Sequence, residues 1–430
     1  MVEPTGFLGL SHLGLVSSIG WASRGDPVVA VDPDPEAVAV LARSRLPVDE
    51  PGLDELLSAA RPRMTFTTDV AALAACPLVM LTRDVPTAED HRSDLLAVER
   101  LVTAAMPHLR PGATLVITSQ VPPGFTRAVA ARARRERSGA GLRVYYWAET
   151  LVVGRAVDRY LRPERIILGC EEPGAALPPT LERGLGLFRC PVLRMRYESA
   201  ELAKAAINLY LSCAVTYTNT LADLCERIGA DWSEVAPALR LDPRIGPAAY
   251  LRPSLGLSGG NLERDVIALH TLAAGCGVDG SFIDAIIECN ARRTRWVMDK
   301  LEALVFAEVP RPTVAVWGLA YKKGTRSLKN APARRVLSAL EGRAAVRAYD
   351  PLAGAADVGA GVLVVSRRDE APLGADCLLI LTDWDEFAAA DPAALRRIMR
   401  RPLVIDCAGA LEGRRGELDG VEYVSMGRAP

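Results

Sequence analysis

The stretch TGFLGLSHLG, residues 5–14, decides how this chain begins to fold. A short apolar run ends at the glycines of GLSHLG, and a helical pattern, LVSSIGWASRG, follows directly. The next apolar run, VVAVD, ends at Asp32. A strand, a glycine turn, a helix and a second strand in this order are typical of a dinucleotide-binding unit, in which a diphosphate lies on the amino terminus of the helix.

Asp32 indicates which dinucleotide this turn would hold. An acid about 20 residues beyond the turn binds the ribose 2′-hydroxyl and disfavours a 2′-phosphate, so the sequence predicts NAD, bound by Gly9, Ser11, Gly14 and Asp32. Ser11 stands where the usual pattern has its second glycine, and its side chain narrows the approach to the phosphates. An ordinary α/β turn with an unrelated aspartate is the alternative.

Apolar runs of strand length recur in both end regions of the chain. They are continuous rather than alternating, which favours strands covered on both faces and therefore parallel sheets. The predicted strands are TGFLGL (5–10), VVAVD (28–32), PLVMLT (77–82), ATLVITS (113–119), VYYWAE (144–149), RIILG (165–169), TVAVWGL (313–319), AVRAYD (345–350), CLLILT (377–382) and LVIDC (403–407). The two regions that carry these runs are candidates for one shared fold.

The middle of the chain is helical in character. One helical pattern runs from residue 196 and ends at Gly229, and SFIDAIIECNARRTRWVMDKLEALVFA is another, before VPRPT ends it. The sequence therefore predicts an α/β protein in which two Rossmann-like parallel-sheet domains, 1–195 and 309–430, flank a central helical domain, 196–308.

Composition argues against several classes of function. The net charge is −1, so no overall field attracts nucleic acid or an anionic membrane, and the basic stretch 127–141 is interpreted as a solvated helix end. The apolar runs are far shorter than the ~20 residues of a membrane span, and MVEPTGFLGL lacks the basic start of a signal peptide. The nine cysteines show no metal-ligand spacing, and their odd number argues against a disulfide framework. We expect a cytoplasmic protein with no metal, nucleic-acid or membrane partner.

Two further stretches suggest chemistry. GLSGGNLERD, residues 256–265, has glycines at a density that indicates backbone passing close to another group. In ELAKAAIN, Lys204 and Asn208 are one helical turn apart and project from one face, where a lysine can steady an oxyanion and an asparagine can bind the same oxygen. Taken alone, such a pair is more often a hydrated helix face.

Together, these motifs resemble one family nearly from end to end: the nucleotide-sugar dehydrogenases, the family of UDP-glucose 6-dehydrogenase and UDP-N-acetylmannosamine dehydrogenase. The similarity runs through GLSHLG with Asp32, LPVDEPGLDELL (46–57), SQVPPGFT (119–126), WAETLVVGRAV with RPERIILG (147–169), ELAKAAIN, DPRIG (242–246), GLSGGNLERD, GLAYKKGT (318–325), AYDP (348–351) and LTDWDEF (381–387). The resemblance implies NAD as cofactor, a nucleotide-sugar substrate such as a UDP-hexose, and a homodimer formed through the central helices. Apolar stripes on those helices agree with a dimer, although a buried core within one chain gives the same pattern.

The resemblance also exposes one severe departure. Such enzymes oxidise the C6 hydroxymethyl group of the sugar to a carboxylate with two NAD, and they hold the aldehyde on a cysteine as a thiohemiacetal. That cysteine lies in a stretch resembling GFGGSCFPKD, and with the glycines and Asp265 in step its position falls on Asn261. A carboxamide is not a nucleophile toward an aldehyde, so the covalent route to the acid is closed. The first oxidation, from alcohol to aldehyde, needs no thiol.

Other roles follow from the resemblance residue by residue. Lys204, Asn208 and Asp265 match residues that bind the reacting oxygen and a water, and Glu149 matches a glutamate linked to that water and to thioester hydrolysis. With Asn261, which can bond either the substrate oxygen or its own loop, they form the predicted catalytic set. The further cofactor-binding residues implied are Thr82, Arg264 and Lys329. The substrate-binding residues implied are Leu151, Arg244, Tyr250, Arg252, Gly259, Tyr321 and Lys322, of which Arg244 reaches the neighbouring subunit's site in some relatives.

Smaller departures from the family's sequence leave more than one reaction possible. Gln120, Ser327 and Ala408 stand where the family has a threonine, an acid and an arginine. The leading hypothesis is a two-electron oxidation that ends at the 6-aldehyde. The alternatives are four-electron oxidation of the aldehyde hydrate, which the kept Glu149 supports, a transient oxidation that epimerises the sugar, and a pseudoenzyme that only binds nucleotide sugars.

Overall fold

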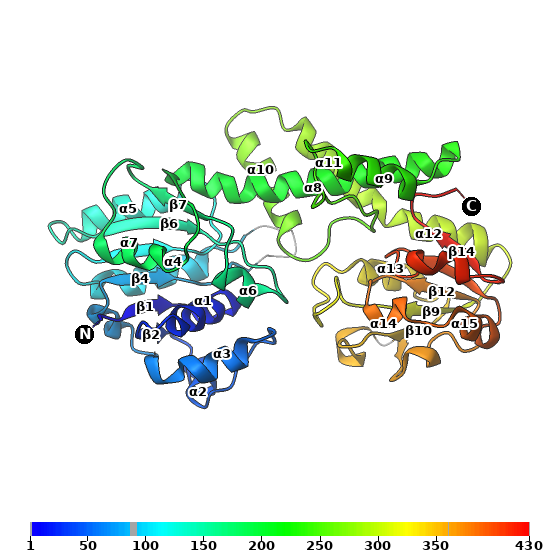
Figure 1. The fold of residues 1–430 in the computed structure, drawn as a ribbon, viewed down its shortest axis with the longest axis horizontal. Coiled ribbons are helices and arrows are strands. Elements are labelled where there is room, and N and C mark those ends of the chain that lie inside the picture. Colours follow the sequence, from blue (N-terminus) through cyan, green and yellow to red (C-terminus); the bar gives the residue numbers. More distant parts are fainter. Residues whose placement is uncertain (1, 87–92, 360, 430) are drawn as a thin grey trace. The chain divides into compact units, whose positions relative to one another are not determined.

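The computed structural model describes residues 2–86, 93–359 and 361–429, and the chain forms two compact units, Met1–Ile207 and Asn208–Pro430. Each unit contains one sheet with helices on its faces (Figure 1). The long helix α8 (Tyr197–Ile228) begins in the first unit and continues in the second. The predicted division into three domains at 195 and 308 stays a prediction.

The first unit is built on an eight-stranded sheet in the order β3-β2-β1-β4-β5-β6-β7-β8. Every neighbouring pair is parallel except β6 with β7, so the expectation of a parallel sheet holds with one antiparallel exception. Its strands are β1 (Thr5–Leu8), β2 (Val28–Val31), β3 (Met64–Thr67), β4 (Leu78–Leu81), β5 (Thr114–Ile117), β6 (Arg143–Ala148), β7 (Ile166–Cys170) and β8 (Val192–Arg196).

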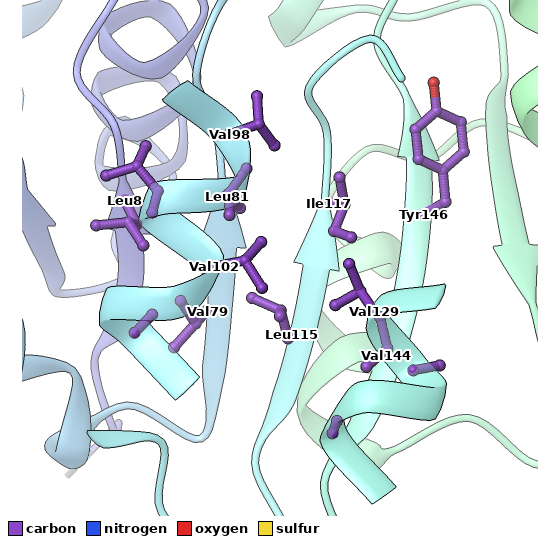
Figure 2. Packing of buried hydrophobic residues seen from close by; sticks show 14 of the residues in the cluster. Leu8, Val79, Leu81, Val98, Val102, Leu115, Ile117, Val129, Val144 and Tyr146 are labelled. Carbon is purple, nitrogen blue, oxygen red and sulfur yellow. The ribbon is translucent and has the colours of Figure 1, made fainter. Parts of the chain in front are cut away.

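Helices cover both faces of this sheet, as the continuous apolarity of the strands requires. Neighbouring residues Phe7 and Leu8 point to opposite faces and belong to different apolar clusters. Figure 2 shows the Leu8 face, where Val98 and Val129 from two helices meet side chains of four strands. The helices are α1 (His12–Ser23), α2 (Pro35–Ala42), α3 (Leu53–Ala60), α4 (Leu96–Ala105), α5 (Phe125–Glu136), α6 (Ala156–Leu161) and α7 (Pro179–Gly186). Fully burying one such aliphatic side chain contributes roughly 1.5–3 kcal/mol.

Long helices open the second unit. The prediction that the first long helix ends at Gly229 is confirmed, because α8 stops at Ile228 and Gly229 adopts a φ of 77°. The second predicted helix, 281–307, is divided at Thr294 and ends in a π-helical turn, Glu302–Phe306. The helices are α9 (Trp232–Leu241), α10 (Leu262–Gly275), α11 (Ser281–Arg293) and α12 (Arg295–Leu301).

The second sheet repeats the strand order of the first. Its order is β11-β10-β9-β12-β13-β14, all parallel, which matches β3-β2-β1-β4-β5-β6 position by position. Its strands are β9 (Thr313–Trp317), β10 (Ala345–Tyr349), β11 (Val362–Val364), β12 (Cys377–Ile380), β13 (Leu403–Asp406) and β14 (Glu422–Ser425), with helices α13 (Pro332–Leu340), α14 (Asp385–Ala388) and α15 (Pro392–Ile398). The expectation that both end regions share one fold is confirmed at the level of topology.

The basic stretch at 127–141 forms most of α5 and the turn after it, so it is more than the predicted helix end, and its arginines are exposed or half-buried. All nine cysteines are free thiols. Among the described residues, none of the helices combines the length and apolarity needed to cross a bilayer, and no cluster of three metal-ligating side chains occurs. The cytoplasmic location stays a prediction.

Candidate active site

The turn after β1 has the shape of a diphosphate cradle. Gly9 adopts a φ of 93°, a left-handed conformation that glycine tolerates best. A Cβ on Gly14 would lie 1.8 Å from the carbonyl oxygen of Gly9, so only glycine lets α1 approach the turn this closely. The N–H groups at the start of α1 therefore point out of the turn toward any bound anion.

Asp32 fits the ribose of NAD. It is 3 % exposed at the end of β2, and its two oxygens accept the N–H groups of Leu10 at 2.7 Å and Asp34 at 3.0 Å. Oδ2 also lies 3.5 Å from the Arg83 guanidinium, whereas Oδ1 has only the N–H of Asp34 among the described residues and can still accept a ribose hydroxyl. A 2′-phosphate would instead place a second anion against Asp32. The turn and the aspartate together suit NAD.

The equivalent aspartate of the second sheet, Asp350 after β10, has no such capacity. Five donors surround its two oxygens at 2.8–3.2 Å: the N–H groups of Leu319, Ala320, Leu352 and Ala353, and the indole N–H of Trp384. The two sheets share one topology but differ at the aspartate that follows their second strand. Asp32 keeps an oxygen that can accept a ribose hydroxyl, whereas the oxygens of Asp350 are surrounded by donors of the protein.

Thr82 and Ser11 make hydrogen bonds that join the turn after β1 to the segment after β4. The hydroxyl of Thr82, fully buried after β4, donates to the carbonyl of Gly9 at 2.9 Å. Ser11 Oγ accepts the N–H of Asp84 at 2.7 Å and lies 3.4 Å from the carbonyl oxygen of Thr82. The Asp84 carboxylate in turn accepts the N–H of Leu13 at 3.0 Å. Direct contacts of Thr82 and Ser11 with NAD stay predictions, and Asp84 was not predicted at all.

In the second unit, Asn208, Asp265 and Arg264 form a buried polar cluster. Each is less than one tenth exposed, Asn208 Nδ2 donates to Asp265 Oδ2, and Arg264 Nε donates to Asp265 Oδ1 at 3.1 Å. Because an ionised carboxylate only accepts, Asp265 fixes the orientation of the Asn208 amide and turns its Oδ1 toward a donor such as a hydroxyl. Arg264, predicted to bind the cofactor, is here the counter-ion of Asp265; its cofactor role stays a prediction.

Lys204 lies one helical turn before Asn208 on α8 and is 8 % exposed. Its ammonium group makes no hydrogen bond or ion pair within the described parts of the chain. Its nitrogen is not fully buried, so the ammonium keeps some contact with water and stays accessible to a ligand. Such a group is suited to an oxygen-bearing ligand.

Side chains from other segments pack closely against the backbone of the glycine loop 256–260. A Cβ on Gly256 would lie 2.4 Å from Asn290 Oδ1, which accepts the N–H of Leu257 at 2.6 Å. Glu263 on α10 accepts from Asn290 at 3.1 Å, and also from Asn330. The loop is therefore pinned by amide side chains that Glu263 holds in place.

Two predicted ligand-binding residues lie against the same loop. A Cβ on Gly259 would lie 2.9 Å from the Tyr321 ring, and a Cβ on Gly260 would lie 2.9 Å from Cε of Lys329. Asn261, the residue before α10, is exposed, and its side chain makes no capping hydrogen bond to the helix. The alternative in which the Asn261 side chain bonds the backbone of its own loop thus finds no support at the start of α10.

A cavity of about 410 Å³ adjoins this loop and gathers four predicted substrate-binding residues, Tyr250, Arg252, Tyr321 and Lys322. Gly256, Leu257 and Ser258 also line it. Arg252 donates to Asp383 at 2.7 Å and to the carbonyl of Gly409 at 3.1 Å, so this cation is held at the cavity wall. An aromatic and cationic wall of this kind suits a base and its phosphates.

Two other predicted substrate residues lie elsewhere. Arg244 is exposed and forms a two-pronged ion pair with Asp242, outside the lining of this cavity. Leu151 and Glu149 line a separate cavity of about 40 Å³ in the first unit. Their roles toward the substrate stay predictions.

The comparisons with known proteins agree with this geometry. Residues 5–183, 198–292 and 315–413 match, in turn, the NAD binding, central and UDP binding domains of the UDP-glucose/GDP-mannose dehydrogenase family.

Individual relatives span the same length. The chain is 31 % identical over 429 residues to UDP-glucose 6-dehydrogenase TuaD of Bacillus subtilis (strain 168), covering 98 % of this chain and 92 % of that protein. It is 32 % identical over 432 residues to UDP-glucose 6-dehydrogenase of Rhizobium meliloti (strain 1021), covering 98 % of both. A solved UDP-glucose dehydrogenase of Pyrobaculum islandicum superposes with a TM-score of 0.88 at 28 % identity, covering 99 % of this chain and 97 % of that one. The chain therefore belongs to the UDP-glucose/GDP-mannose dehydrogenase family and is an NAD-dependent nucleotide-sugar dehydrogenase.

Proposed function

We propose that this enzyme oxidises the C6 hydroxyl of a UDP-hexose to the 6-aldehyde and stops at that two-electron stage. The observation that carries the proposal is Asn261, an exposed carboxamide directly before α10, next to the glycine loop that lines the cavity. The sequence resemblance implies a cysteine at this position in the family. The names of the relatives support UDP-glucose as the substrate type.

The thiol that lines this cavity does not replace a catalytic cysteine. Cys407 is buried, and its burial, together with the neighbouring Asp406, raises the pKa of the thiol well above its usual range. The thiolate is the nucleophile in covalent catalysis, so Cys407 stays in the unreactive, protonated form.

The residues on α8 and α10 suit the first oxidation. Gly9, Gly14 and Asp32 would hold NAD⁺, which would supply the hydride acceptor for C6. The hydroxyl would lose its proton, so that alcohol and NAD⁺ would give aldehyde, NADH and H⁺. In our proposal Lys204 donates to the reacting oxygen and stabilises its growing negative charge. Asn208 Oδ1 accepts from the hydroxyl of the alcohol, and Asp265 keeps that amide in the required orientation. The Asn261 amide donates to the same oxygen.

A second candidate is the four-electron oxidation of the aldehyde hydrate to the uronic acid. The cavity of about 40 Å³ beside Glu149 supports it, since one water needs only about 10–15 Å³ of such space. A carboxylate next to an ordered water can act as a general base.

Trapping of the product separates the two candidates. The enzyme is incubated with NAD, a UDP-hexose and O-benzylhydroxylamine, and the nucleotide sugars are identified by mass. We expect the 6-oxime of the UDP-sugar as the main product. A uronic acid without oxime would favour the second candidate, and an unchanged sugar would favour a pseudoenzyme.

We also propose a homodimer formed through α8. The exposed side chains Tyr210, Tyr217 and Leu224 recur every seven residues, with Ile228 one turn further, and so form an apolar stripe on one helix face. A second copy of the same helix suits such a stripe.

Light scattering is expected to give twice the chain mass for the wild type and the single-chain mass for Tyr217→Glu. The matched control is Leu363→Glu, which puts the same charge on an exposed edge-strand residue and should remain dimeric. A dimeric Tyr217→Glu variant would contradict this interface.

A further inference from the structure

The amino end of α1 already holds an anion of this chain's own. Leu13, the second residue of α1, donates its N–H to Asp84 Oδ2 at 3.0 Å. Asp84 is an exposed residue on the segment that follows β4, more than seventy positions away along the chain. The contact therefore depends on the fold and is not a local cap.

Ser11 determines where Asp84 lies. Its Oγ accepts the N–H of Asp84 at 2.7 Å and lies near the carbonyl of Thr82. A glycine, which the dinucleotide-binding pattern has at this position, could make neither contact. The serine that narrows the phosphate turn is also the residue that brings the carboxylate to the helix.

Asp84 and the diphosphate of the cofactor would both bind at the amino end of α1. The first N–H groups of a helix and the positive end of its dipole are what a dinucleotide diphosphate binds. The Asp84 carboxylate uses the N–H of Leu13 and adds a negative charge beside the turn. The neighbouring cation, Arg83, lies 3.5 Å from Asp32 and so is directed toward the ribose position.

We propose that Asp84 is an internal competitor of the cofactor diphosphate: it occupies the amino end of α1 in the free enzyme and is displaced when NAD binds. The displacement lowers the affinity for every ligand that carries the adenosine diphosphate group, NADH included. An enzyme whose turnover depends on NADH release would gain from this. The proposal rests on NAD binding by the first unit and not on the extent of sugar oxidation.

The test measures binding without catalysis. ADP-ribose carries the diphosphate but no nicotinamide, and adenosine carries no phosphate, so their dissociation constants are compared by calorimetry for the wild type, Asp84→Asn and Asp84→Ala. Both variants should bind ADP-ribose about threefold to thirtyfold more tightly, the range that a charge at a helix end produces. Adenosine affinity should not change.

The same Asp84 variants that bind ADP-ribose more tightly should be less stable without ligand. Because Leu13 loses a charged acceptor, the ligand-free variants should melt at a lower temperature than the wild type while binding ADP-ribose better. The matched control is Asp391→Asn, which removes an exposed aspartate that accepts the N–H of Ala393 at the start of α15. It should lower the melting temperature without changing ADP-ribose affinity.

A second variant keeps the proposal testable if Asp84 substitutions impair folding. Ser11→Gly should also tighten ADP-ribose binding, and its effect should not add to that of Asp84→Asn, because both act through one carboxylate. Unchanged or weaker ADP-ribose binding in Asp84→Asn and Ser11→Gly would overturn the proposal. That outcome leaves the oxidation product undecided, so the two proposals fail independently.

Discussion

Lys204→Met is expected to reduce the rate of NADH formation by about a thousandfold, the upper range for loss of one donor to a developing oxyanion. The side chain is 8 % exposed and, within the described residues, makes no hydrogen bond or ion pair, so it serves no structural partnership that the substitution would break. Methionine keeps the length and apolar stem and removes only the charge. The variant should therefore be about as stable as the wild type, because no hydrogen bond or ion pair of the described residues is lost.

The measurement is a steady-state rate of NADH formation with a UDP-hexose, together with a melting temperature. The matched control is Lys300→Met, which removes a lysine that pairs with Glu226 at 3.0 Å away from the nucleotide cavity. It should lose stability but keep its rate. If Lys204→Met retained more than a tenth of the wild-type rate, the role assigned to this lysine would be wrong.

Asn261→Cys is expected to convert the enzyme from one NADH per sugar to two. The thiol can add to the aldehyde to give a thiohemiacetal, whose oxidation by a second NAD⁺ gives a thioester, and hydrolysis then releases the acid and the thiol. Residue 261 precedes α10, and a helix amino terminus lowers the pKa of a thiol there and favours its reactive form. Asn261 is exposed and makes no capping bond, so the exchange costs little stability.

The readouts are the mass of the product and the number of NADH formed, before and after treatment with iodoacetamide. Ser258→Cys is the control, because it places a thiol on the lining of the same cavity but not at the start of the helix. It should continue to give one NADH. An Asn261→Cys variant that still makes only aldehyde would show that more than the thiol has been lost.

Much of the fold was predictable because its strands are buried on both faces. All ten predicted strands are present, and α8 ends where Gly229 indicated. The four strands that were missed, β3, β8, β11 and β14, are the edge strands of the two sheets. Their residues are partly exposed, so they carry a weaker apolar signal.

The site was predictable only in part. The structure brings Asn208 into contact with Asp265 and gathers Tyr250, Arg252, Tyr321 and Lys322 around one cavity, and the roles of these residues stay predictions. The contact of Asp84 with α1 joins distant segments and leaves no periodic signal in the sequence. One hint was available: Asp84 follows a predicted strand that neighbours β1, and the ends of such strands meet at the cofactor.

Similar sequence patterns also lead to different side-chain environments, which depend on the packing of distant segments. VVAVD and AVRAYD both end a second strand in aspartate, yet Asp350 is surrounded by donors whereas Asp32 keeps free acceptor sites. Asn290, Asn330 and Glu263, which pin the glycine loop, come from three separate segments. No spacing rule in one sequence connects such residues.

The number of NADH formed per sugar consumed tests the central claim most directly. The purified enzyme is incubated with excess NAD and a panel of UDP-hexoses. The amount of NADH formed is divided by the amount of sugar consumed, and the product is identified by mass spectrometry. We predict one NADH per sugar and a 6-aldehyde or its hydrate. Two NADH with a uronic acid would contradict the two-electron account and would mean that Asn261 and Glu149 complete the second oxidation without a thiol.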